Sequence, residues 1–136
     1  MPELSALLAA ASLGAMLFFS AVIAPSVFQV LDEQAAGRFL RAIFPRYFAV
    51  NGLMALLAAA LALRPLESGV LVLCAALMLG VRRFVIPIIK EARDAATAGD
   101  KAANARFNAW HRVSVVVNLI EMALLAAVIY ILLAKP

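Results

Sequence analysis

Four long apolar stretches constrain this chain more than any other feature of its sequence. An α-helix needs about 20 apolar residues to cross the ~30 Å hydrocarbon core of a bilayer. Hydrophobic residues make up 66% of the 136-residue chain and charged residues 15%, whereas about half of a soluble domain is apolar. We therefore predict an all-α integral membrane protein, a four-helix bundle in a single transmembrane domain (1–136), with spans at about 4–31, 46–63, 69–90 and 110–134.

The remaining composition narrows the class of membrane protein. Cys74 is the only cysteine and His111 the only histidine, so the sequence contains no intrachain disulfide, Cys-x-x-Cys motif or histidine cluster. It also shows no Ser-His-Asp set and no pair of catalytic carboxylates. We therefore expect no enzymatic activity, no metal site and no cofactor. The net charge of +4 comes from basic residues beside the apolar stretches, where they orient the protein, so we expect no nucleic-acid partner.

Prolines and charged residues mark the boundaries within this pattern. Pro25 and Pro87 each remove a backbone hydrogen bond near the end of a span, which predicts two helix kinks. Residues 32–44 begin with acidic residues, continue with arginines and have one apolar side, which predicts a short interfacial helix between the first two spans, stopped by Pro45. A break at Gly99-Asp100 is expected in the charged, helical connection that precedes the last span.

Lysine and arginine residues are distributed unequally between the two ends of the predicted bundle. Two of them, Arg64 and Lys135, belong to one end, and ten lie in or beside the first and third connections at the other end. The positive-inside rule places those two connections in the cytoplasm and both termini outside. We expect an integral protein of a bacterial inner (plasma) membrane, in contact with membrane lipids. The ten residues are Arg38, Arg41, Arg46, Arg82, Arg83, Lys90, Arg93, Lys101, Arg106 and Arg112.

A polar stripe enters the last apolar stretch. His111, Ser114, Asn118 and Glu121 follow one another at spacings of three, four and three residues, which place them on one face of a helix. A carboxylate inside a membrane-spanning helix is unfavourable by roughly 2.5–3.5 kcal/mol, so Glu121 should face protein or water and have a partner. His111, next to Trp110, is interpreted first as an interface residue, and a metal or haem ligand is the alternative.

Asn51, Arg82 and Arg83 are predicted to lie in the cytoplasmic halves of neighbouring spans. The third span is too short without the apolar residues that follow the two arginines, so one arginine should snorkel to the interface while the other points inward. We expect the inward arginine to form an ion pair with Glu121. Together with Asn51 and the polar stripe, it would line a pocket open to the cytoplasm.

Several short motifs along the chain share the pattern of a known family. They are Gly14-x3-Phe18-Phe19-x2-Val22-x-Ala24-Pro25-x2-Phe28, Ala36-Gly37, Phe44-Pro45-x-Tyr47, Ile86-Pro87 and Phe107-x2-Trp110-His111-x2-Ser114-x3-Asn118. This pattern resembles the transmembrane protein 205-like family, also known as domain of unknown function 4149, although the family has Leu-His where this chain has Trp110-His111. The resemblance implies a four-helix membrane protein. A vertebrate relative linked to resistance to platinum drugs implies export or trafficking, but the resemblance implies no reaction and assigns no binding residue.

Three functions remain open from the sequence. The leading hypothesis is that the protein binds and translocates or exports a small solute or ion through the polar pocket. In that case Glu121 is a proton-titrating or cation-binding group, and the arginines form an anion-binding vestibule. Four helices provide little material for alternating access, so a transporter of this kind is expected to be a homodimer. The alternatives are a non-catalytic accessory or assembly subunit of a membrane complex and a haem- or quinone-linked redox protein.

Overall fold

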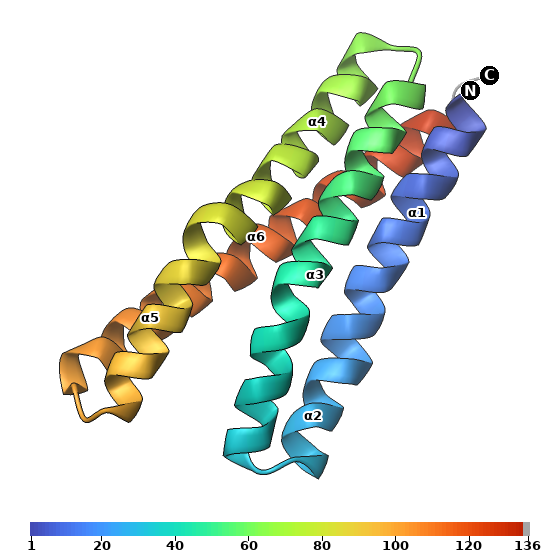
Figure 1. The fold of residues 1–136 in the computed structure, drawn as a ribbon. Helices are drawn as coiled ribbons and strands as arrows, with labels where there is room; N and C mark the ends of the chain where they lie inside the picture. The colour runs from blue at the N-terminus through green and yellow to red at the C-terminus, as the bar shows by residue number, and fades with distance from the viewer. Residues whose placement is uncertain (135–136) are drawn as a thin grey trace.

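The computed structural model describes residues 1–134, which form four long helical columns packed side by side (Figure 1). Each column is long and apolar enough to cross a membrane. The prediction of an all-α, four-helix membrane bundle is therefore confirmed for this part of the chain, whereas Lys135 lies outside it. In chain order the columns comprise α1 (Pro2–Phe18), η1 (Phe19–Ile23) and α2 (Ala24–Val30); α3 (Glu33–Leu61); α4 (Pro65–Gly80), η2 (Val81–Val85) and α5 (Ile86–Thr97); and α6 (Lys101–Ala134).

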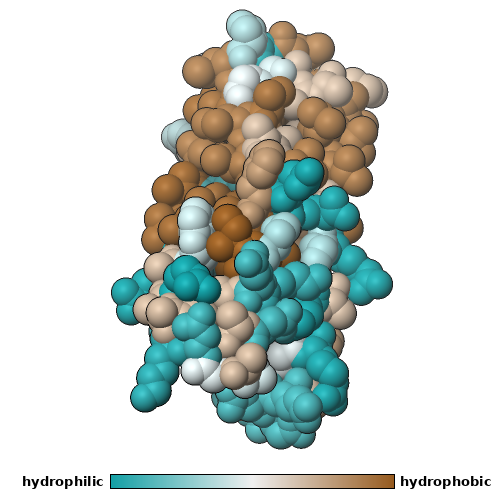
Figure 2. All heavy atoms as spheres, turned by 60° about the vertical axis from the view of Figure 1, so that its left-hand side comes forward, coloured by the Kyte–Doolittle hydropathy of each residue, from teal (hydrophilic) through white to brown (hydrophobic). Residues whose placement is uncertain are grey.

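The two ends of the bundle differ in what they contain. The start of α1, the end of α6 and the short turn between α3 and α4 lie together at one end, which we call the terminal end (Figure 1). The turn between α2 and α3 and the turn between α5 and α6 lie at the other, which we call the charged end. A space-filling view shows apolar surface over one half of the molecule and hydrophilic side chains gathered over the other (Figure 2).

Each predicted kink coincides with a single turn of π-helix. Pro25 and Pro87 have no backbone N–H, and a π-helical turn, η1 or η2, ends one residue before the α-helix that contains each proline. At the ends of these turns the N–H groups of Ala24 and Ile86 donate to carbonyls five residues back, those of Phe19 and Val81. The first and third columns therefore share one local feature, a widened turn followed by a proline.

The prediction of a separate interfacial helix over residues 32–44 is wrong. These residues form the first turns of α3, which continues through Pro45 without a break. The Asp32 side chain caps the helix by accepting from the Ala35 N–H at 2.8 Å. A proline removes only one intrahelical hydrogen bond, and beside Pro45 two guanidinium groups, of Arg46 and Arg82, donate to the carbonyls of Ala42 and of Pro45 itself. The segment is therefore the first part of the long helix α3 rather than a separate helix lying on the membrane.

The connection between α5 and α6 contains the break that was expected at Gly99-Asp100. Gly99 has φ +103°, a conformation that a side chain disfavours, so glycine suits this turn. The Asp100 carboxylate then accepts from the N–H groups of Ala102 and Ala103 and caps α6. No second break follows, and α6 is continuous from Lys101 through the whole polar stripe to Ala134.

Packing is close near the terminal end and opens toward the charged end. Near the terminal end α1, α3, α4 and α6 surround a common core, whereas farther down α2 stays beside α3 and α5 beside α6 (Figure 1). Two exposed ion pairs, Arg41 with Asp94 at 2.7 Å and Arg93 with Glu33 at 2.9 Å, join α3 to α5 across the opening. Small side chains let the helices approach in the common core, which includes Ala6, Ala9, Ala55, Ala58, Ala59 and Ala75.

Gly52 marks the closest approach of α3 to α4. A Cβ atom placed at Gly52 would lie 2.9 Å from Leu79 Cγ and 3.3 Å from Met78 Cβ. At Gly14, which is also helical, a Cβ atom would meet nothing within 4 Å. Gly52 is therefore required by packing, and Gly14 serves as its matched control.

We expect Gly52→Ala to lower the free energy of unfolding by about 1–3 kcal/mol relative to Gly14→Ala, because the added methyl group must displace α4. Both substitutions gain the same helix propensity, so their difference isolates the steric effect. The measurement is reversible unfolding in mixed micelles, followed by the fluorescence of Trp110. Equal stabilities for the two variants would show that α3 and α4 are packed less closely than described.

Candidate functional site

Glu121 is the most unusual side chain in the bundle. It lies on α6 with none of its surface exposed, and neither carboxylate oxygen has a hydrogen-bond partner among the described residues. Transfer of an ionised carboxylate into an apolar interior is strongly unfavourable unless the charge is paired or neutralised. A buried Glu121 therefore needs a proton or a cation. In the described part of the chain it is the only buried carboxylate of which both oxygens lack a hydrogen-bond partner.

A chain of hydrogen bonds runs across the bundle beside Glu121. The Ser12 hydroxyl donates to Asn51 Oδ1 at 2.8 Å, and Asn51 Nδ2 donates to the backbone carbonyl of Tyr47 at 2.9 Å. The Tyr47 hydroxyl then donates to Asn118 Oδ1 at 2.7 Å. These contacts connect α1, α3 and α6, and we call the four residues together with Glu121 the polar layer.

The polar layer begins about midway across the apolar part of the bundle and extends from there toward the charged end. Ser12 is ten residues from the start of α1 at Pro2, and Asn51 is ten residues from the end of α3 at Leu61, or ~15 Å in each case. Glu121 is thirteen residues from Ala134, or ~20 Å. Since the hydrocarbon core is ~30 Å thick, the terminal half of the bundle separates the layer from one membrane face.

Tyr47 and Cys74 belong to the surroundings of Glu121. The Tyr47 hydroxyl bonds to Asn118, three residues before Glu121 on α6, and Cys74 is fully buried on α4, close enough to Glu121 for a charge there to act on its thiol. One sequence signal favoured Tyr47: it precedes Asn51 by four residues and so lies on the same face of a helix.

The predicted ion pair between Glu121 and an inward-pointing arginine is wrong. Arg82 Nε donates to the Pro45 carbonyl at 3.0 Å, and the Arg83 guanidinium lies over the ring of its neighbour Phe84 at 5.6 Å. Both arginines are exposed. A long arginine side chain reaches the interface by snorkelling at less cost than the desolvation that a buried ion pair requires.

The polar stripe of α6 divides into two parts. Asn118 and Glu121 belong to the polar layer. The buried Ser114 hydroxyl instead donates within its own helix, to the His111 carbonyl at 2.7 Å. The His111 ring is exposed and stacks on Phe107 at 5.8 Å with an interplanar angle of 7°. Of the seven residues predicted to line one pocket, the structure thus brings together Asn51, Asn118 and Glu121. Their role in binding stays a prediction.

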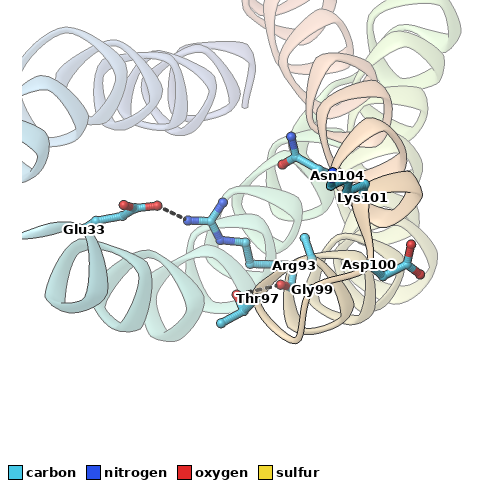
Figure 3. A pocket seen from close by; sticks show the side chains of 8 residues that line it. Glu33, Arg93, Thr97, Gly99, Asp100, Lys101 and Asn104 are labelled. Carbon is cyan, nitrogen blue, oxygen red and sulfur yellow. Dashed lines mark hydrogen bonds and ion pairs between the residues drawn. The ribbon is translucent and has the colours of Figure 1, made fainter.

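The bundle is hollowed at the charged end, away from Glu121. An open cleft of about 540 Å³ lies between the start of α3 and the turn that joins α5 to α6 (Figure 3). Arg93 crosses it, bound to Glu33 on one side and placed over the Phe107 ring at 5.1 Å on the other. Acidic and basic groups are balanced around the cleft, which is lined by Glu33, Arg93, Ala96, Thr97, Gly99, Asp100, Lys101 and Asn104.

Metal ligation has little support in this arrangement. Within residues 1–134 no group of three or more His, Cys, Asp and Glu side chains is close enough to hold a metal ion. The chemistry available to the polar layer is therefore proton exchange and the binding of a hard cation by oxygen atoms.

We expect Tyr47→Phe and Asn118→Leu to be coupled, because each removes one partner of the same 2.7 Å hydrogen bond. Hydrogen bonds between membrane helices have coupling energies of about 0.6 kcal/mol on average and up to ~1.7 kcal/mol. Unfolding of the wild type, both single variants and the double variant in mixed micelles gives this energy directly. Strict additivity would show that Tyr47 and Asn118 do not interact.

Comparison with known proteins gives a family but no characterised relative. No curated protein and no solved structure matches the chain. A family model, by contrast, matches residues 7–134, which include all four columns and every residue of the polar layer. The chain belongs to the family described as domain of unknown function 4149 (DUF4149).

Proposed function

We propose that the protein translocates a small ion or solute across the membrane and that Glu121 is the group whose charge is neutralised and released during each cycle. The observation that supports this proposal is the burial of Glu121 with both oxygens unpartnered. A carboxylate kept only for helix packing would be expected to have hydrogen-bond donors. Without them it destabilises the fold, and a destabilising polar group in a membrane bundle favours a functional role.

The surroundings of Glu121 are consistent with a closed resting state. Cys74 on α4 and Leu125, one turn farther along α6, are fully buried. The neighbouring polar groups, the Tyr47 hydroxyl and the Asn118 amide, are hydrogen-bonded to each other on the side of Glu121 that faces the charged end. Exchange with the aqueous phase therefore requires a local opening between α3 and α6, and it is easiest toward the charged end, where the columns diverge.

The two π-helical turns provide places for such an opening. A π-turn has one backbone hydrogen bond fewer than regular helix, and the proline that follows it removes another, so each column can bend there at low cost. We propose a homodimer as the functional unit, because four helices are too few to line a pathway that opens alternately to the two sides of the membrane. The proposed location is a bacterial inner membrane with the charged end in the cytoplasm.

We expect Glu121→Gln to reduce ion flux to the level of protein-free liposomes. The probe is a proton gradient driven by a potassium diffusion potential and read by a trapped pH-sensitive dye, with parallel samples that contain a sodium or potassium indicator. Glu67→Gln is the matched control, because Glu67 is also a buried carboxyl but lies at the terminal end beside Arg64, at 3.7 Å. Wild-type flux of all three cations through Glu121→Gln would exclude Glu121 from the pathway.

Thermal stability distinguishes the proposed role of Glu121 from a structural one. Glu121→Gln and Glu121→Leu break no hydrogen bond and remove a buried ionisable group, so we expect an unchanged or higher melting temperature. Loss of stability by about 1–3 kcal/mol would instead identify Glu121 as a packing residue, as an accessory subunit would need.

Orientation is testable with single cysteines in a Cys74→Ser background. We expect Leu63→Cys, which is exposed at the terminal end, to react in intact cells with a thiol reagent that does not cross membranes. Asn104→Cys at the charged end should react only after the cells are opened. The reverse pattern would place both termini in the cytoplasm.

A further inference from the structure

Six of the ten basic residues assigned to the charged end form two groups that differ in their partners. Arg41, Arg93 and Arg106 form ion pairs with Asp94, Glu33 and Asp100. Arg46, Arg82 and Arg83 lie closer to the apolar half of the columns, and among the described residues none of the three has a carboxylate within 4.0 Å. Positive charge at this second level is therefore unbalanced by protein.

Arg46 and Arg82 are held in a defined relation to each other. Arg46 Nη1 donates to the Ala42 carbonyl at 3.0 Å, and Arg82 Nε donates to the Pro45 carbonyl at 3.0 Å. Residues 42 and 45 are three positions apart on α3, so their carbonyls lie on neighbouring turns of one helix face. Two guanidinium groups, one from α3 and one from η2, are thereby anchored to carbonyls that lie about one helical turn apart along α3, or ~5 Å.

The level of this pair matches a membrane boundary. Arg46 is fifteen residues from the end of α3 at Leu61, or ~23 Å, and Arg82 is seventeen residues from Pro65, or ~26 Å. With a hydrocarbon core of ~30 Å and snorkelling side chains, both guanidinium groups reach the layer of lipid phosphates. The adjacent Phe84 ring is 67% exposed and suits contact with acyl chains.

We propose that Arg46 and Arg82 form a clamp for the phosphate group of an anionic phospholipid in the leaflet at the charged end. Each arginine uses one N–H for its carbonyl contact, so Arg82 keeps both Nη groups and Arg46 keeps Nε and Nη2 to donate to phosphate oxygens. Paired guanidinium donors match a phosphate in geometry as well as charge. A lipid fits better than free phosphate because the clamp borders apolar surface. The site does not depend on Glu121 or on transport.

The test is native mass spectrometry of the full-length protein in mild detergent, titrated with phosphatidylglycerol or with phosphatidylcholine. We expect Arg46→Gln/Arg82→Gln to weaken phosphatidylglycerol binding about tenfold relative to the wild type. Arg38→Gln/Lys101→Gln removes the same charge from exposed sites at this end and should bind within about twofold of the wild type. If both double variants lost phosphatidylglycerol affinity equally, binding would depend on charge alone, and the proposal would be overturned.

Two further experiments are needed. One distinguishes the donor geometry of the arginines from their charge, and the other distinguishes binding of a lipid from binding of free phosphate. Arg82→Lys keeps the charge but lacks the fork of donors, so a binding loss of several-fold supports the clamp and wild-type binding contradicts it. Titration with inorganic phosphate alone should give no adduct that depends on Arg46 and Arg82. A clamp-dependent phosphate adduct without a phosphatidylglycerol adduct would overturn the assignment to lipid. Melting curves confirm that each variant is folded before it is titrated.

Discussion

The constraint on which this structure depends is that a polar group inside a membrane bundle must find its partner within the protein. The Ser5 hydroxyl donates to the Ala58 carbonyl, Ser68 donates to Ala59, and Ser12 reaches Asn51 across two helices. These contacts tie α1 and α4 to α3 and help to set the order of the columns. Against this background the unpartnered carboxylate of Glu121 has no structural explanation. Its neighbours form hydrogen bonds with one another and leave it without a donor.

The same constraint explains the local shape of the columns. A proline leaves a carbonyl without its N–H partner, and each of the three prolines inside a column is handled differently from a regular turn. Before Pro25 and Pro87 the chain widens into a π-turn, and around Pro45 it stays helical while two arginine side chains bind nearby carbonyls. Arg46 and Arg82 thus donate to backbone carbonyls near the end of the apolar region, where water becomes available. Because Arg82 binds there, it does not reach the interior, where an ion pair with Glu121 was expected.

The sequence was sufficient for features that depend on composition along the chain. Apolar run lengths predicted four spans, and the clustering of basic residues predicted which connections share an end.

The sequence was insufficient where the result depends on which of several possible partners a side chain contacts. Pro45 predicted a helix end because nothing in the sequence shows that Arg82, 37 positions away, donates to its carbonyl. Asn118 and Glu121 could be found from helical spacing. Aromatic residues near span ends usually lie at the membrane interface, so the sequence alone does not reveal that packing of α3 against α6 turns the Tyr47 hydroxyl inward.

The positions of these features along the membrane normal are consistent with one working arrangement. Between the polar layer and the terminal end the bundle is closed by small apolar side chains, and beyond the layer toward the charged end the columns separate. Glu121 is therefore closer to the charged side of the membrane, both in the packing that separates it from water and in distance, since it lies ~20 Å from Ala134 and the hydrocarbon core is ~30 Å thick. Opening toward the terminal side would require α1 and α4 to move away from α3, at the cost of the close packing at Gly52 and of buried serine hydrogen bonds. Movement of α5 away from α3 beyond the π-turn breaks two exposed ion pairs, each worth about 0.2–1 kcal/mol. Under the proposed function, exchange of Glu121 with the charged side would therefore come first, and release to the other side would be the energetically demanding step.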